Sequence, residues 1–146
     1  MSGQIDVGWA APPFGLLQLD EGKIRKIATG DDAAAFKGQT VRLLITNVQT
    51  LQNRKAVLER FMKAYRETID ALYSGDPAAL QTYADFTGIS LATAKRTRDE
   101  FFPKSAVDPD RIIGIDATSQ DAVELKYTTT PLSKEQLAEL IQIPPR

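Results

Sequence analysis

The chain has 146 residues, of which 42% are hydrophobic and 25% are charged, the composition of one ordinary globular domain. Its formal net charge is −1, so it lacks the basic field that attracts phosphates, and we expect no nucleic-acid partner. No apolar run reaches the roughly 18 residues that a membrane-spanning helix needs, and we expect no membrane insertion.

Cysteine and histidine are both absent from the chain. Their absence removes thiol nucleophiles, imidazole general bases and the usual ligands of zinc. Any catalysis would depend on carboxylates, lysines, tyrosines or an external cofactor. We therefore expect a protein that is not an enzyme and that holds no metal and no cofactor.

The first third of the chain predicts β-strands. Residues 5–10, 24–28 and 41–48 are short apolar stretches, and the last of them is rich in β-branched residues. Pro12 and Pro13 form a turn after the first stretch, and residues 14–19 predict a short helix. The turn is of interest because ligands of open α/β sheets bind beyond the carboxyl ends of the strands.

The remainder of the chain predicts helices. From Asn53 to Ser74, apolar residues recur at steps of three and four, which predicts one long amphipathic helix. The apolar stripe consists of Val57, Leu58, Phe61, Met62, Tyr65, Ile69, Leu72 and Tyr73. Such a stripe favours burial in a core, although Phe61, Met62 and Tyr65 could instead form a groove for a partner.

Start and stop signals delimit the helices that follow. Asp76, with a proline after it, opens a helix that ends at Gly88, and Ser90 opens the next, which Pro103 ends.

Two further helices are expected near the C-terminus, over residues 120–127 with Ser119 as the cap, and after the capping box that begins at Ser133. The acidic residues of the intervening turns are predicted to be solvated rather than to bind a cation, because they lack the spacing of a calcium loop. These residues are Asp31, Asp32, Asp108, Asp110 and Asp116.

Strands followed by helices are typical of α+β proteins rather than of doubly wound sheets. A sheet of three strands has too little surface for five helices to pack against. Either the helices form a layer of their own, or strands from a second copy or from another part of the protein complete the sheet.

Several segments, in this order, resemble the C-terminal part of the periplasmic solute-binding proteins of ABC importers, in the nitrate, sulfonate and taurine group that includes binders of thiamine-pyrimidine precursors. The similar segments are residues 3–7 leading to Trp9 and Pro12-Pro13, residues 21–23, residues 41–47 and residues 54–65. The similarity extends over nearly the whole chain, but no single motif in it is diagnostic.

The resemblance implies an α/β fold: a partial periplasmic-binding-protein type II fold, with a short sheet in the first third and a helix-rich C-terminal two-thirds. Residues 1–40 would form the end of the second α/β lobe, residues 41–50 a crossover or hinge strand, and residues 51–146 the helices that return to the first lobe. Members of the family bind their ligand between two lobes, so the N-terminal half of the first lobe is expected to be missing here.

The candidate ligand-binding residues follow the first and third predicted strands; they are Trp9, Ala10, Pro12, Pro13, Phe14, Thr46 and Asn47. Trp9 could stack on a planar ligand or could pack beneath the next helix. The prolines would leave the amides of Phe14 and Gly15 free for an anion. Thr46 and Asn47 could bind a ligand from the hinge, or could simply form a turn.

Three functional interpretations remain open at this point. The first is the substrate-binding component of an ABC importer, or a fragment of one, for a small organic or oxyanion solute such as a sulfonate, nitrate or a pyrimidine. The resemblance then implies an ABC permease as partner, and a periplasmic location if the precursor has a signal peptide, of which this chain shows none. The second is a self-associating interaction module, and the third an enzyme of the thiamine-precursor type. As it stands, the chain is expected to form a homo-oligomer, because unpaired strands invite pairing.

Overall fold

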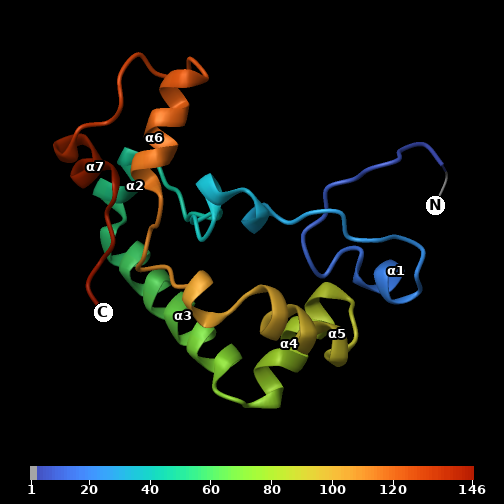
Figure 1. Cartoon of the computed structure of the whole chain (residues 1–146). Helices are drawn as coiled ribbons and strands as arrows, with labels where there is room; N and C mark the ends of the chain where they lie inside the picture. The colour runs from blue at the N-terminus through green and yellow to red at the C-terminus, as the bar shows by residue number, and fades with distance from the viewer. Residues whose placement is uncertain (1–2) are drawn as a thin grey trace.

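The computed structural model describes residues 3–146 and shows a helical protein with an extended N-terminal third (Figure 1). Seven α-helices lie in this range: α1 (Leu16–Asp20), α2 (Val48–Asn53), α3 (Lys55–Tyr73), α4 (Pro77–Thr87), α5 (Leu91–Arg96), α6 (Ile115–Glu124) and α7 (Lys134–Leu140). A long segment without helix or strand, broken by two short 3₁₀ turns, crosses from α1 toward α2.

The predicted α/β fold with a short sheet is wrong for the described residues, because no strand occurs anywhere in residues 3–146. The three predicted strands, residues 5–10, 24–28 and 41–48, lack any ladder of hydrogen bonds between them, and only Val48 of the third enters a helix. β-Propensity measures how well a residue packs on a sheet, so it does not produce a strand when no neighbouring strand is within reach.

The long amphipathic helix is confirmed as α3, but only its second half is packed as a core helix. Ile69 is buried, whereas Phe61 and Tyr65 are stacked on each other at 6.1 Å and stay open to solvent. The favoured interpretation, burial in a core, is therefore wrong for Val57, Phe61 and Tyr65, whereas Leu58 and Met62 are half-buried. These exposed side chains leave an apolar surface on α3.

The helical hairpin α4–α5 carries the best-formed core, and its predicted boundaries are confirmed. Asp76 Oδ1 accepts a hydrogen bond from the amide of Ala78 at the start of α4, and Gly88 ends that helix at φ 68°, where glycine fits without strain. A cluster of apolar side chains closes between the two helices and the end of α3; its buried members are Leu80, Ala84 and Ala94, packed against Leu72, Tyr83 and Ile89.

The chain continues beyond α5 as a π-helical turn, Thr97–Phe101, so the helical region reaches nearly to Pro103 as predicted. The Tyr73 hydroxyl donates a hydrogen bond to the carbonyl of Phe102, and Arg98 donates to the carbonyl of Leu72 at 2.9 Å. Burial raises the pKa of Tyr73, which keeps its hydroxyl protonated as the donor of this bond. These bonds fasten the end of the hairpin to α3.

A serine of α6 holds the segment that leads into α7, which differs from the role predicted for it. Ser119 was predicted to cap a helix, but it lies inside α6 and is buried, and its hydroxyl accepts the amide of Leu132 at 2.7 Å. Gly114, at φ 81°, precedes α6 instead. The capping box at Ser133 is confirmed, because its side chain and that of Gln136 bond each other's backbone at the start of α7.

The last part of the crossing segment, residues 41–46, is fastened on both sides. Thr40 donates its amide to Ile113 at 3.0 Å and accepts the amide of Ile113 on its hydroxyl at 2.9 Å. Gln39 Nε2 donates to Thr118 Oγ1 at 2.5 Å, and a Cβ added at Gly114 would lie 2.8 Å from Gln39. At the other end, Asn47 caps α2.

A buried arginine on α3 organises the C-terminal tail. Arg66 is only 8% exposed and makes a forked pair with Asp110, at 2.9 Å from Nε and 2.7 Å from Nη2. The same guanidinium donates to the carbonyls of Pro144 at 2.5 Å and Pro145 at 3.2 Å, and Arg146 reaches Asp110 at 2.6 Å. Asp110 was predicted to be a solvated turn residue; instead it links three segments.

This ion pair predicts a dependence of stability on acidic pH. The hydrogen bond from Arg66 lowers the pKa of Asp110, so its ionised form stabilises the fold above the ordinary carboxyl pKa, and that stabilisation is lost as the pH falls through the lowered value. Urea unfolding should therefore show that the wild type has a higher free energy of unfolding than Asp110→Asn. This difference should be largest near neutral pH and should decrease below about pH 4. A difference that stays constant down to the lowest pH would contradict this role of Asp110.

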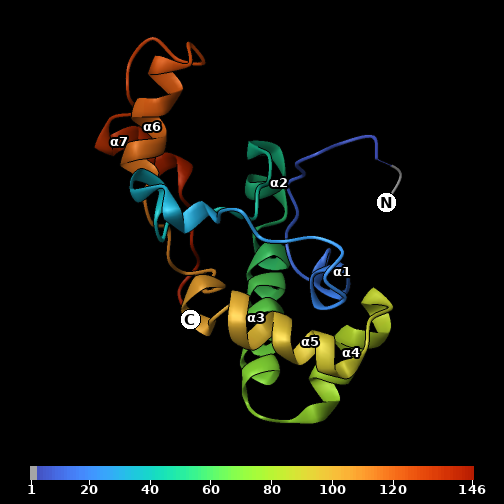
Figure 2. The same ribbon diagram turned by 45° about the vertical axis from the view of Figure 1, so that its right-hand side comes forward.

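The chain exposes far more surface than a compact monomer of its size. Its accessible surface is 11594 Å², whereas a folded monomer of this mass exposes about 7,400 Å². Figures 1 and 2 show why: α6 and α7 form one end, α4 and α5 form the other with α1 beside them, and the extended segments between the two ends are covered by little else. More protein surface is needed to cover this arrangement.

Candidate ligand-binding hollow

The extended N-terminal third and the helices border a wide open hollow of about 3250 Å³. Sites for small ligands usually measure about 300 to 1,000 Å³. The hollow is therefore not a finished solute site, and other protein must fill part of it before a small molecule could be enclosed.

Six of the seven predicted site residues border this one hollow, although they come from two segments far apart in the chain. They are Trp9, Ala10, Pro12, Phe14, Thr46 and Asn47. Pro13, the seventh, is half-buried in the turn behind them and joins Pro12 through a cis peptide bond. The same hollow also takes in residues from α3, from residues 96–113 and from the C-terminal tail, so the two predicted groups share a very broad boundary and make no direct contact with each other among the described residues.

Trp9 is 87% exposed, so the possibility that it packs beneath the following helix is wrong. A large aromatic side chain left open at the edge of a concave surface is available for stacking on a planar group. Phe14, a few residues further on, is also exposed and extends the apolar surface.

The turn after Trp9 is less open to an anion than the sequence suggests. The amide of Phe14 donates to the carbonyl of Ala11 at 3.1 Å, so the prediction that this amide is free for an anion is wrong. Gly15 adopts φ 83° and starts α1, a helix of five residues. We therefore assign no anion site to this helix start.

Thr46 and Asn47 differ in the bonds that they make. Asn47 Oδ1 accepts the amide of Thr50 at 2.7 Å and so caps α2, which is the local turn role considered for it. The side-chain NH₂ of Asn47 makes no hydrogen bond among the described residues. The side chain of Thr46 is exposed and also makes no hydrogen bond there. Both side chains keep hydrogen-bonding capacity for a ligand.

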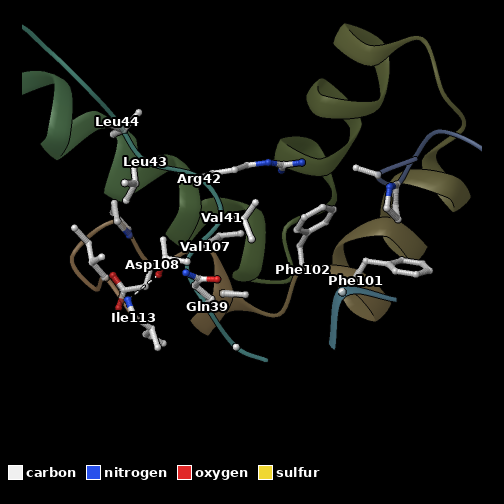
Figure 3. A pocket seen from close by; sticks show the side chains of 18 of the residues that line it. Gln39, Val41, Arg42, Leu43, Leu44, Phe101, Phe102, Val107, Asp108 and Ile113 are labelled. Atoms are coloured by element: carbon white, nitrogen blue, oxygen red, sulfur yellow. Dashed lines mark hydrogen bonds between the residues drawn. The ribbon is translucent and has the colours of Figure 1, made fainter. Parts of the chain in front are cut away.

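Figure 3 shows a wall of the hollow that the sequence analysis missed. Arg42 extends from the crossing segment and lies over the ring of Phe102, with 5.0 Å between the guanidinium carbon and the ring centre. Val41, Leu43 and Phe101 line the same region. A sequence signal was present, since Arg42 is the one charge within the apolar run 41–46.

Ion pairs gather beside one wall of the hollow, where Arg96 and Glu100 line it. Arg96 bonds Asp20 of α1 at 2.6 Å and Glu100 at 3.1 Å. Nearby, hydrogen bonds from Arg98 and Lys95 lower the pKa of Asp99 to about 2, so it is ionised at any pH near neutrality. These carboxylates are committed to cations, and none is poised to act as a general base.

The described residues contain no group of three or more acidic side chains that could hold a metal ion. Among them, no helix is both long and apolar enough to cross a membrane. A comparison of the chain with protein-family models, curated proteins and solved structures finds no match.

Proposed function

We propose that the chain serves in solute recognition, as part of the substrate-binding component of an ABC importer for a small organic or oxyanion solute such as a sulfonate, nitrate or a pyrimidine. On this proposal its membrane partner is an ABC permease, and its place of action is the periplasm. The proposal comes from the sequence resemblance and makes no use of a sheet within this chain.

One observation carries the proposal furthest. The residues singled out from the sequence, Trp9 and Phe14 on one segment and Thr46 and Asn47 on another, border the same hollow. Together they offer an apolar aromatic surface and a few hydrogen-bonding groups, which is the usual composition of a small-molecule site. The hollow is wide open, and in binding proteins of this kind a site is enclosed only when a second body closes over it.

The chemistry of the hollow favours binding without turnover. Histidine and cysteine are absent from the chain, and two carboxylates that line the hollow, Glu100 and Asp108, are each paired with an arginine. Recognition needs only shape, stacking and hydrogen bonds, all of which the residues at the hollow can provide.

Trp9 is the only tryptophan, so its emission reports on this site alone. Titration of the chain with nitrate, taurine and a hydroxymethylpyrimidine should give a saturable change of emission with at least one of them. Trp9→Ala should weaken binding of that solute, measured by calorimetry, by about 1 to 3 kcal/mol because one aromatic contact is lost. Its melting temperature should stay unchanged, because the side chain is exposed.

Tyr127→Ala provides the matched control. Tyr127 is as exposed as Trp9 but does not border the hollow, so this variant should bind the solute as the wild type does. The proposal fails if none of the three solutes gives a saturable signal, or if Trp9→Ala and Tyr127→Ala bind equally well.

A further inference from the structure

The last part of the crossing segment, residues 41–46, combines two properties that rarely coexist in a monomer. Val41 and Ile45 are 89% and 91% exposed, and Leu43 and Leu44 are each 51% exposed. In addition, no hydrogen bond joins the backbone of residues 41–46 to any other described part of the chain. Unpaired backbone beside exposed β-branched side chains is a template for pairing with another strand.

We infer that a second copy of this chain pairs with residues 41–46, antiparallel about a two-fold axis, and that the resulting homodimer covers the hollow. The inference rests on the exposed segment and does not require that the proposed solute function be correct. It also goes beyond that function, because it names the surface and the residue register through which two copies meet.

The available area fits a second copy. The whole chain exposes about 4,000 Å² more than a compact monomer of its mass would. Each copy therefore has enough open surface for its share of a stable interface, which buries about 1,200 to 2,000 Å² over both partners. A two-fold interface needs a surface that is complementary to itself. An extended segment provides one, because each backbone offers the donors and acceptors that its copy lacks.

The charge of the segment also favours a second copy of the chain as its partner. The segment carries one charge, Arg42, which already lies over Phe102, and the whole chain has a net charge of −1. Two copies therefore approach without strong repulsion, and an apolar, nearly uncharged strand is matched best by another of the same kind.

The side chains select one register. In a paired strand, residues 41, 43 and 45 lie on one face. If Leu43 lies opposite Leu43 of the second copy, then Val41 lies opposite Ile45, and the most exposed side chains of both copies cover one another. Arg42 then lies opposite Leu44 and not opposite another Arg42, so like charges are kept apart. Thr46 and Asn47 lie just beyond this paired core.

The absence of cysteine from the chain makes a clean cross-linking test possible. Leu43→Cys should form a disulfide-linked dimer under mild oxidation, because directly opposed residues of antiparallel strands have the spacing that a disulfide needs. Leu44→Cys is the matched control: its residue is equally exposed and adjacent, but in this register it faces position 42, so its cross-link should form at least tenfold more slowly. Leu125→Cys, exposed at the end of α6, should also cross-link slowly.

The oligomeric state provides the second measurement. Light scattering without any solute should give twice the chain mass of 16.1 kDa for the wild type and for Phe86→Lys, whose residue is 89% exposed on α4. Val41→Lys combined with Ile45→Lys should lower the mass to that of the monomer, with helical circular dichroism retained.

A wild type that stays monomeric at all concentrations would overturn the inference. So would cross-linking that is as fast at position 44 or 125 as at position 43, or a double variant that remains dimeric. Each result is independent of solute binding, which the Trp9 emission reports separately.

Discussion

Replacing Arg66 with alanine is expected to lower the free energy of unfolding by about 3 to 5 kcal/mol. The guanidinium is buried and holds Asp110 and the carbonyls of Pro144 and Pro145, so its loss leaves a partly buried carboxylate and two backbone acceptors without their main partner. Small domains have only about 5 to 15 kcal/mol of stability in total. Urea unfolding measures the loss, and hydrogen exchange should show faster exchange in residues 141–146.

Two variants show whether the loss comes from the ion pair. Arg66→Met keeps most of the apolar stem but none of the donors, so it should be nearly as unstable as Arg66→Ala. Arg60→Ala removes an exposed arginine from the same helix and should change stability by less than about 0.5 kcal/mol. Equal stability of Arg66→Ala and Arg60→Ala would mean that the buried pair does not hold the tail.

Leu80→Ala is expected to cost about 2 to 5 kcal/mol, because it opens a cavity in the best-packed part of the molecule. Leu80 packs with Ala84 and Ala94 where α4 meets α5, and the two alanines allow the helices to approach closely. Neither alanine has the volume to fill the space that the leucine leaves. Thermal unfolding followed by circular dichroism measures the effect.

Phe86→Ala is the matched control on the same helix. It removes a larger side chain than Leu80→Ala does, yet its residue is exposed, so it should change the melting temperature little. A loss for Phe86→Ala as large as that for Leu80→Ala would place the stabilising contacts of α4 on its other face.

The parts of the fold that follow from local chemistry could be predicted from the sequence. Asp76, Gly88 and Ser133 end or begin helices through bonds to residues two to four positions away, and the structure confirms all three. The long helix α3 was equally predictable, because its period of apolar residues is a property of the segment itself.

The parts that depend on distant partners could not be predicted. A strand exists only if another strand pairs with it, so the apolar run 41–46 gave no strand among the described residues. Arg66 was not singled out, because its burial depends on Asp110, which is 44 residues away, and on Pro144, which is 78 away. Ser119 was misassigned for the same reason: a serine has the same local signature whether it caps a helix or binds a distant amide.

The candidate site lies between these two cases. The sequence indicated Trp9 because it ends the first apolar run, and Phe14 because its amide follows two prolines; both are local patterns. It did not indicate Arg42, since the ring of Phe102 that receives its guanidinium is brought there by the fold.

The two anchors of the crossing segment have an entropic consequence. Ordering one free residue costs about 1 to 2 kcal/mol of backbone entropy, which an interface must repay before any affinity remains. Residues 41–46 are held at one end by Thr40 and Ile113 and at the other by the Asn47 cap, so much of that freedom is already lost in the single chain. The hydrogen bonds of Gln39 to Thr118 and of Thr40 to Ile113, distant from the exposed side chains, therefore affect how tightly any partner of this segment can bind.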